Sequence, residues 1–439
     1  MFKNFFKTLF GKKSSDEDTR KIEDSCNYWA DKDAVDYSPS FTAQDVLSST
    51  ETVNASDTTL SKETEEDKKN TSGGSLGCGG GCGGGCIGGC GGGIVMAQKY
   101  FGLQWHITDS CDQRCKHCYI YAGKDLCKNN DLPFEKLSVI LQDFIITSKK
   151  MKRTPFISVT GGDPLLYKNV WDFLELLKQN NIKFAILGNP FHITDEVAMK
   201  LKDYGCINYQ MSLDGLEATH DFIRKKGSFT ATLSKLNCLR KAGIATTIMA
   251  TVSKSNIDEI PNLVDTVVKY EVDNFAFARY CPNPDDFQNI VSAEEYHEFL
   301  GTMWEKFISY KDSHTKFVLK DHLWTLFLYE NGLFNIDNVE NPKDLILDGC
   351  RCGISHMTVL SDGTVYACRR CESPIGKVPE ESLYDIFFGE KMKQYRQYEK
   401  FEECSKCKLK NFCRGCPSVA KCLSGNFYGK DPQCWKTIK

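Results

Sequence analysis

The sequence predicts an α/β fold: a partial (β/α)6 barrel, preceded by a disordered N-terminal region and followed by a cysteine-rich C-terminal domain. Between residues 96 and 285, apolar β-branched runs alternate with helical stretches, which is typical of βα units around a parallel sheet. Six such units are too few for a closed eight-stranded barrel but enough for an open one. Residues 1–95 lack this alternation, and cysteines gather between residues 350 and 434. The chain therefore divides into three regions of different character.

The first 95 residues divide further into three segments. In residues 1–13, Phe and Leu recur at helical spacing with lysines between them, which predicts an amphipathic, leader-like helix that docks on a protein groove rather than on a membrane. Residues 14–77 are rich in Ser, Thr and acidic residues, so we expect a disordered tether. Residues 78–95 form a Gly-Cys repeat that favours neither helix nor strand, because glycine loses the most backbone entropy on ordering. Its thiols stand four residues apart: Cys78, Cys82, Cys86 and Cys90.

The barrel region, residues 96–285, carries six apolar runs that we expect to be strands. These runs cover residues 101–108, 155–160, 183–189, 207–214, 245–252 and 274–280. Helical periodicity is clear over residues 133–150, 170–181 and 231–243. We expect residues 286–345 to be a helical linker and residues 346–439 to be the cysteine-rich domain.

Composition excludes several classes of protein. The formal net charge is −3 and no block of Lys and Arg stands out, which argues against a nucleic-acid partner. No apolar run is long enough to span a bilayer, and the N-terminus lacks the apolar core of a signal peptide, so we expect a cytoplasmic protein without membrane contact. In such a chain, 22 cysteines indicate metal binding or redox chemistry rather than disulfides. Four isolated thiols are expected to be inert core residues: Cys26, Cys206, Cys238 and Cys281.

A triplet of cysteines follows the first predicted strand. The stretch "CDQRCKHC" places Cys111, Cys115 and Cys118 on one loop, at the strand ends where parallel barrels carry their chemistry. Three thiolates can hold three irons of a [4Fe–4S] cluster and leave the fourth iron open to another ligand. The alternative is a zinc site whose fourth ligand is His117 or Cys127.

These residues resemble the radical SAM enzymes, in which the open iron binds S-adenosylmethionine. The resemblance covers roughly residues 100 to 280 and rests on motifs at successive strand ends. "GGDP", which is Gly161, Gly162, Asp163 and Pro164, resembles the family's Gly-Gly-Glu-Pro motif that receives the methionine amino group, with Asp in place of Glu. "SLDG", with Ser212 and Asp214, resembles the ribose contact, and Arg224 occupies the place of an arginine near the methionine carboxylate.

The C-terminal cysteines resemble the SPASM extension of radical SAM peptide-modifying enzymes, which carries two auxiliary [4Fe–4S] clusters. By this resemblance, one cluster is held by Cys404, Cys407, Cys413 and Cys434. The other is held by Cys352, Cys368 and Cys416, completed by Cys350 or Cys371. Cys422 has no clear place, and the last C-x2-C is one residue shorter than the commonest form. Zinc ribbons are the alternative.

The resemblance implies a maturase of ribosomally made peptides that forms thioether crosslinks in a cysteine-rich peptide. Residues 1–95 look like such a precursor, so the hypothesis is that precursor and maturase are fused and that the tether presents the repeat at an effective concentration of order millimolar. An electron donor such as a flavodoxin or ferredoxin is the other expected partner. Glycine suits the chemistry because no Cβ shields its Cα hydrogens and the flanking amides delocalise the resulting radical. Asp214, Glu217 and His220 are the acid–base candidates near the expected pocket.

Three alternatives stay open. In the first, the repeat is a flexible linker or a soft-metal site. In the second, the enzyme modifies a separate peptide or protein. In the third, the chain is a non-catalytic iron–sulfur or zinc scaffold. Sulfatase maturases tend to carry Asp directly after the cysteine that corresponds to Cys368, and here Arg369 stands in that place, which weakens sulfatase maturation as the reaction.

Overall fold

The computed structural model describes residues 43–44, 100–119, 131–282, 286–338 and 346–437. The predicted leader helix, the Gly-Cys repeat, Cys26 and Cys127 lie outside these residues. Within them, a single ten-stranded sheet has the order β10-β9-β8-β1-β2-β3-β4-β5-β6-β7. Strands β1 to β7 run parallel to their neighbours, which confirms the predicted α/β fold around an open, partial barrel.

The six predicted strands are all present, as β1 to β6, and their apolar residues are buried because helices cover the outer face of the sheet. A seventh parallel strand, β7, follows them inside the segment expected to be a helical linker. Three residues are too few to produce a periodic signal, which is why the pattern missed β7. The strand bounds are β1 Tyr100–Thr108, β2 Thr154–Gly161, β3 Phe184–Leu187, β4 Cys206–Ser212, β5 Ala245–Val252, β6 Asn274–Arg279, β7 Lys316–Val318, β8 His356–Val359, β9 Thr364–Tyr366 and β10 Pro374–Lys377.

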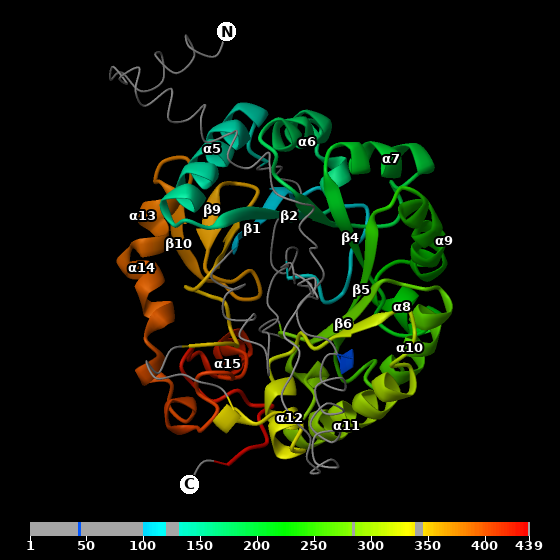
Figure 1. The fold of residues 1–439 in the computed structure, drawn as a ribbon, viewed down its shortest axis with the longest axis vertical. Helices are drawn as coiled ribbons and strands as arrows, with labels where there is room; N and C mark the ends of the chain where they lie inside the picture. The colour runs from blue at the N-terminus through cyan, green and yellow to red at the C-terminus, as the bar shows by residue number, and fades with distance from the viewer. Residues whose placement is uncertain (1–42, 45–99, 120–130, 283–285, 339–345, 438–439) are drawn as a thin grey trace, which may run out of the picture.

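Helices surround the strands as an outer ring, from α5 through α11 (Figure 1). The three helices expected from periodicity appear as α5, α6 and α9 within a few residues of their predicted bounds. The bounds are α5 Phe134–Lys150, α6 Val170–Gln179, α7 Asp195–Asp203, α8 Glu217–Ile223, α9 Ser228–Lys241, α10 Ile260–Lys269, α11 Ala293–Ser309, α12 Trp324–Glu330, α13 Leu383–Phe388, α14 Glu390–Lys393 and α15 Pro417–Ser424. Short 3-10 turns cover Pro164–Leu166, Phe287–Asn289, Ile336–Asn338, Gln394–Arg396, Tyr398–Lys400 and Cys404–Lys406.

The C-terminal domain joins the barrel through the sheet itself. Strand β8 pairs in parallel with β1, and β9 and β10 continue the sheet as antiparallel strands. Helices α13 and α14 pack beside this extension, and α15 lies near the open side of the barrel (Figure 1). Because β9 runs back along β8, Cys352 just before β8 and Cys368 just after β9 lie at the end of the sheet where β1 begins, opposite the loops that follow β1 and β2.

Part of the predicted tether contacts the barrel. Gln44 donates from Nε2 to the carbonyl of Thr315 at 3.0 Å and accepts from the amide of Phe317 at 3.4 Å. Because the amide of Lys316 instead pairs with the carbonyl of Asp273 beside β6, Gln44 occupies the outer edge of β7. Ala43 is buried against the same hydrophobic core.

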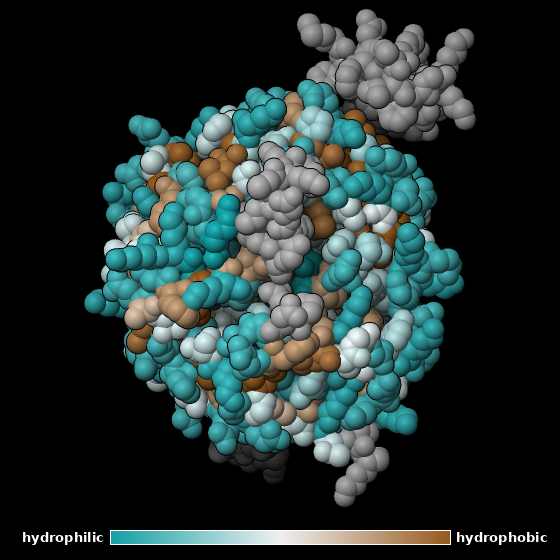
Figure 2. All heavy atoms as spheres, turned by 180° about the vertical axis from the view of Figure 1, so that it is seen from behind, coloured by the Kyte–Doolittle hydropathy of each residue, from teal (hydrophilic) through white to brown (hydrophobic). Residues whose placement is uncertain are grey.

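The surface seen from the opposite side is mostly hydrophilic, and hydrophobic side chains form several separate patches rather than one broad face (Figure 2). In the described parts of the chain, every helix is too short or too polar to cross a membrane.

Candidate functional site

A cavity of about 390 Å³ lies inside the partial barrel. It is lined at one end by the loop that follows β1, including Cys111, Cys115 and Cys118, all of which are free thiols. Asn189 donates to Cys111 Sγ at 3.2 Å, and Arg224 Nη1 lies 3.7 Å from Cys115 Sγ. Burial raises the pKa of the Cys111 thiol and raises that of Cys115 to about 11. A metal ion that holds the thiolate overcomes this cost, so the loop fits a metal cluster.

The "GGDP" segment packs directly against this cysteine loop. The amide of Gly162 donates to the carbonyl of Thr108 at 2.8 Å, and that of Asp163 donates to the carbonyl of Ser110 at 2.7 Å. A Cβ at Gly161 would lie 2.1 Å from the Thr108 oxygen, and one at Gly162 would lie 2.2 Å from the Ser110 oxygen. Both positions therefore need glycine, because any side chain would push the cysteine loop away.

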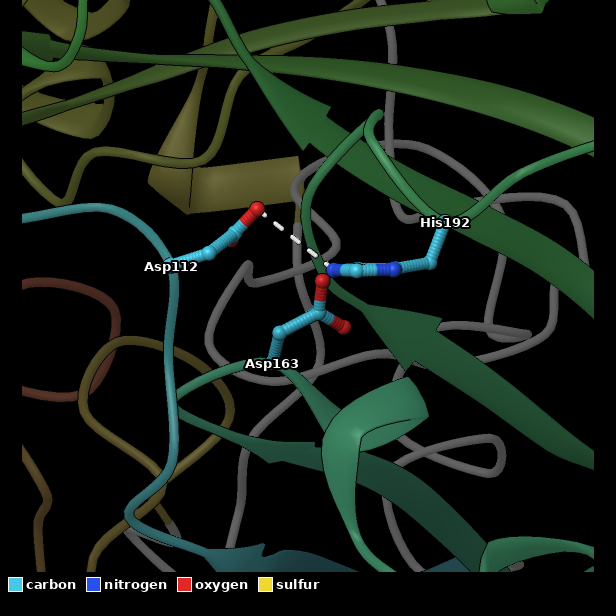
Figure 3. A group of neighbouring side chains, drawn as sticks. All are labelled: Asp112, Asp163 and His192. Carbon is cyan, nitrogen blue, oxygen red and sulfur yellow. Dashed lines mark ion pairs between the residues drawn. The ribbon is translucent and has the colours of Figure 1, made fainter.

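Asp163 is fully buried at the end of β2, and its Oδ2 has no hydrogen-bond partner, whereas Oδ1 accepts from the amide of Leu165 at 3.1 Å. Burial raises the pKa of the Asp163 carboxyl to about 6. Asp112 and His192 lie beside it, 3.4 Å apart, and the ligand atoms of the three residues lie within 4.8 Å of one another (Figure 3). Asp163 does not itself line the cavity, although the adjacent Gly161 and Gly162 do. Its orphaned carboxylate oxygen fits an ammonium ligand such as the methionine amino group of S-adenosylmethionine.

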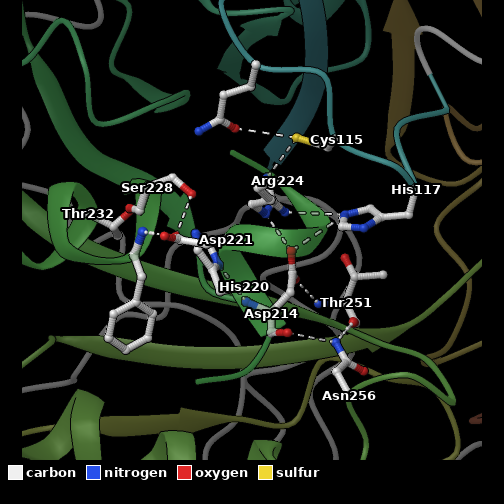
Figure 4. A network of polar contacts seen from close by, with 12 residues as sticks. Cys115, His117, Asp214, His220, Asp221, Arg224, Ser228, Thr232, Thr251 and Asn256 are labelled. Atoms are coloured by element: carbon white, nitrogen blue, oxygen red, sulfur yellow. Dashed lines mark hydrogen bonds and ion pairs between the residues drawn. The ribbon is translucent and has the colours of Figure 1, made fainter. Parts of the chain in front are cut away.

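Arg224 reaches the cavity from the end of α8 and is held there by Asp214 (Figure 4). Asp214 is fully buried, accepts from the amide of Thr251 at 2.8 Å and from Arg224 Nε, and lies 3.6 Å from His117 Nε2. Burial alone would raise the pKa of the Asp214 carboxyl, but the charge of Arg224 holds it below its usual range. Asp214 does not line the cavity, so it acts by fixing Arg224 rather than by touching a ligand there.

The other residues predicted to contact a ligand or a proton fall into two groups: those that line the cavity and those that lie outside it. Ser212, at the end of β4, lines the cavity, whereas Pro164 starts a short 3-10 turn behind it. His220 is buried outside the cavity and its Nδ1 accepts from the amide of Asp214 at 3.1 Å. Burial lowers the pKa of the His220 imidazole to about 4. Glu217 is exposed and binds Thr230, so the structure removes all three acid–base candidates from the cavity wall.

The opposite end of the cavity is lined by cysteines of the C-terminal domain. Cys350, Cys352, Cys368 and Cys416 all face it. Neighbouring thiols lie within hydrogen-bonding distance along a row. Cys350 contacts Cys352, Cys352 contacts Cys368, and Cys368 contacts Cys371. The structure thus brings five thiols together and leaves open which of Cys350 and Cys371 completes the predicted ligand set.

The remaining predicted ligands form a second group outside the cavity. Cys404, Cys407, Cys413 and Cys434 lie close enough for their charges to interact, and Cys404 and Cys413 are buried. Burial raises the pKa of the Cys404 thiol to about 12. Four thiols suit a closed site, and the two separate groups fit two clusters as the sequence predicts.

Two thiols outside the predicted ligand sets meet beside the cysteines that line the cavity. The sulfur atoms of Cys281 and Cys422 lie 3.5 Å apart, and Cys281 lines the cavity. The prediction that Cys281 is an inert core residue is therefore wrong, and its position just after the sixth strand was the signal that could have placed it at the cavity. Cys206 is a buried core residue, as expected.

Three further cavity residues were not identified as a group from the sequence: Gln104, Tyr119 and Arg369. Gln104 faces inward from β1, and Tyr119 directly follows the cysteine loop. Arg369 is more than 200 residues away from Gln104 and Tyr119 in the sequence, and only the tertiary fold brings the three residues to one cavity.

Two family models match the chain. The Radical SAM superfamily model matches residues 105–267, and the SPASM iron-sulfur cluster-binding domain model matches residues 350–417. The first match contains the cysteine loop, the "GGDP" segment and Arg224, and the second contains the cysteines that line the far end of the cavity.

Similar proteins fall into more than one functional group. An AdoMet-dependent heme synthase from Oleidesulfovibrio alaskensis is 24% identical over 343 residues, which cover 76% of this chain and 86% of the relative. Mycofactocin maturase MftC from Mycolicibacterium smegmatis is 24% identical over 349 residues, covering 76% and 82%. The crystal structure of Streptococcus suis SuiB bound to precursor peptide SuiA superposes with a TM-score of 0.62 at 19% identity and covers 77% of this chain and 76% of that one.

Proposed function

Because this chain is a radical SAM superfamily enzyme with a C-terminal SPASM domain, we propose that it installs thioether crosslinks in a cysteine-rich peptide, namely its own residues 78–95. The radical SAM domain binds a [4Fe–4S] cluster and S-adenosylmethionine, and the SPASM domain binds auxiliary clusters. When bound, the first pair supplies a 5′-deoxyadenosyl radical, which abstracts hydrogen from unactivated carbon.

The observation that carries the proposal is the shared cavity. The cysteine loop after β1 and four cysteines of the C-terminal domain line one continuous space. A peptide in that space meets the site of hydrogen abstraction at one end and an auxiliary iron–sulfur site at the other. Asp163 would hold the amino group and Arg224 the carboxylate of the methionine portion, and the barrel wall would exclude water from the reacting carbon.

The chemistry balances with one S-adenosylmethionine per crosslink. A peptide thiol and a peptide C–H become a C–S bond. One of the two hydrogens lost leaves as an atom in 5′-deoxyadenosine and the other leaves as a proton. Cleavage of S-adenosylmethionine would consume one electron and formation of the C–S bond would release one, which an auxiliary cluster held by the cavity-lining cysteines of the C-terminal domain would accept.

Chain connectivity supports modification of the chain's own repeat. Nine residues separate Cys90 from Tyr100, and at about 3.5 Å per extended residue they span roughly 35 Å. The nine residues of β1 are about 30 Å long, so an extended repeat reaches the cysteine-bearing end of that strand. On the other side, Gln44 is bound at β7 and thirty-three residues lead from it to Cys78, which leaves ample slack. SuiB, whose title names a bound precursor peptide, and MftC, whose name is that of a maturase, support a peptide substrate.

Mass spectrometry tests the proposal. The full chain is reconstituted anaerobically with iron, sulfide, reductant and S-adenosylmethionine, then reduced, alkylated and digested, and the peptide that contains Cys78 to Cys90 is weighed. We expect a loss of two hydrogens per crosslink with a matching loss of alkylatable thiols, and we expect neither in a Cys115→Ala variant. If all four thiols alkylate fully while 5′-deoxyadenosine accumulates, the substrate is a separate molecule and the proposal is wrong.

A further inference from the structure

Arg369 lines the cavity. It directly follows Cys368, yet its guanidinium faces the barrel: it lies over the ring of Tyr119, 4.7 Å from the centroid. With the Gln104 carboxamide oriented so that its oxygen faces Arg369, that oxygen accepts from Nη1 and from Nε at 3.3 Å. Tyr119 is the residue after Cys118, so Arg369 bridges the cysteine loop of the barrel and the auxiliary cysteines.

The charge of Arg369 is not balanced by a carboxylate in the described part of the chain. Arg224 pairs there with Asp214, and Arg279 pairs with Asp321 and Asp431. Arg370, the next residue, contacts Cys416 Sγ at 3.5 Å and so balances the auxiliary thiolates. A partly buried guanidinium without a counter-charge is costly, and an anionic ligand offsets that cost.

Tyr119 supplies a second unused donor. Its hydroxyl is buried and has no hydrogen-bond partner. Leaving such a donor unpaired is unfavourable, and a ligand that accepts a hydrogen bond removes this cost. The guanidinium and the hydroxyl are both donors, so the ligand that suits them is an acceptor and carries negative charge.

The repeat offers one kind of anion. From Thr71 to Gln98 the sequence contains no Asp or Glu, so the cysteine side chains are its only ionisable groups. An adjacent cation stabilises the thiolate form of cysteine.

We propose that Arg369 and Tyr119 bind the reacting cysteine of the peptide as its thiolate, between the site of hydrogen abstraction and the auxiliary cysteines. This inference rests on the proposed function and names the group that the cavity recognises. The thiol releases its proton to solvent on binding, and the sulfur then faces the peptide carbon with a lone pair available for C–S bond formation.

A binding measurement without turnover tests the inference. The full chain carries Ser at Cys78, Cys82, Cys86 and Cys90, is reconstituted anaerobically and is given S-adenosylmethionine but no reductant. The probes are two fluorescent peptides with the sequence of residues 73–95, one native and one with Ser at all four cysteines, and binding is followed by anisotropy. We expect the native peptide to bind about tenfold more tightly than the Ser peptide, because a charged hydrogen bond is worth about that factor.

Variants separate the roles. Arg369→Gln is expected to abolish the preference for the native peptide, Arg369→Lys to keep part of it, and Tyr119→Phe to reduce it. Arg240→Gln, an exposed arginine on α9 that pairs with Glu271, is the matched control and keeps the parental preference. If the preference survives in Arg369→Gln, or if both peptides weaken equally, the thiolate is not the group that Arg369 holds.

A second readout keeps the test decisive if the peptides bind too weakly to measure. In the full chain with its native repeat, Arg369→Gln is expected to form 5′-deoxyadenosine while crosslinks per 5′-deoxyadenosine fall about tenfold. A parental ratio in this variant overturns the inference while leaving the proposed function intact. Absence of crosslinks in the parent chain overturns the proposed function instead.

Discussion

At the residue scale, Asp214 shows how a buried group can act on the cavity without lining it. Its carboxylate pairs with Arg224 and lies near His117, and the amide of Thr251 fixes it from β5 (Figure 4). Arg224 side-chain exposure is only 14%, so the guanidinium has little freedom while Asp214 is charged. Asp214 therefore fixes the position in which the Arg224 guanidinium meets a ligand carboxylate.

Replacing Asp214 by Asn tests this positioning role. We expect the dissociation constant for S-adenosylmethionine to rise about tenfold, since Arg224 loses a charged hydrogen bond and its fixed position, while the iron content stays at the parental level. Equilibrium dialysis with labelled S-adenosylmethionine measures the constant. Glu217→Gln, an exposed carboxylate on the neighbouring α8, is the control and leaves it unchanged. Parental affinity in Asp214→Asn would show that Arg224 needs no such support.

At the element scale, the backbone at the end of β2 packs directly against the backbone of the loop after β1. Two backbone hydrogen bonds join them, and two glycines allow the approach. The register of β1 on β2 shifts between His106 and Thr108, just before the cysteine loop begins. The loop geometry that collects the three thiols thus depends on backbone contact as well as on the cysteines.

Gly162→Ala tests this contact. The new Cβ would lie 2.2 Å from the Ser110 oxygen, so we expect the cysteine loop to shift and the chain to lose about one third of its iron, the share of one cluster among three. Iron and sulfide analysis after anaerobic reconstitution measures the loss. Gly301→Ala, in the middle of α11 with no atom within 4 Å of the added Cβ, is the control and retains full iron content. Full iron content in both variants would mean that the loop tolerates displacement.

At the scale of the whole molecule, Arg279 joins the barrel to the C-terminal segment. It is buried at the end of β6, and it binds Asp321 at 2.9 Å and Asp431 through two bonds of 2.8 Å. Asp431 in turn accepts from the amide of Cys416 at 2.7 Å. One buried network therefore links the barrel to a predicted ligand of the cluster that faces the cavity.

Arg279→Met breaks this link and leaves two carboxylates buried without their partner. Removing one member of a buried ion pair costs about 3–5 kcal/mol, so we expect a large drop in the urea concentration at which the C-terminal domain unfolds. Tryptophan fluorescence and limited proteolysis, under anaerobic conditions, follow the transition. Arg240→Met, which removes a half-exposed pair with Glu271, is expected to shift it little. Equal midpoints for the two variants would contradict a linking role for Arg279.

Much of the architecture could be predicted from local patterns. The β-branched runs place β1 to β6 within a few residues, and helical periodicity places α5, α6 and α9, because burial against a single core imposes these periods on the sequence. The three-residue β7 and the pairing of β8 with β1 could not be predicted, since short strands carry no period and pairing partners are far apart in the chain.

The sequence by itself determined which chemical motifs the chain contains: a C-x3-C-x2-C loop, a "GGDP" turn, two sets of C-terminal cysteines and a Gly-Cys repeat. These are local motifs, and their metal-binding or backbone requirements are visible in the spacing. Only the tertiary structure decided which groups share a space. It moved Glu217 and His220 off the cavity wall, put Asp214 behind Arg224, and brought Cys281 to Cys422 and Arg369 to Tyr119. Contacts between distant segments depend on how strands and loops pack around one cavity, and spacing along the chain carries no record of that.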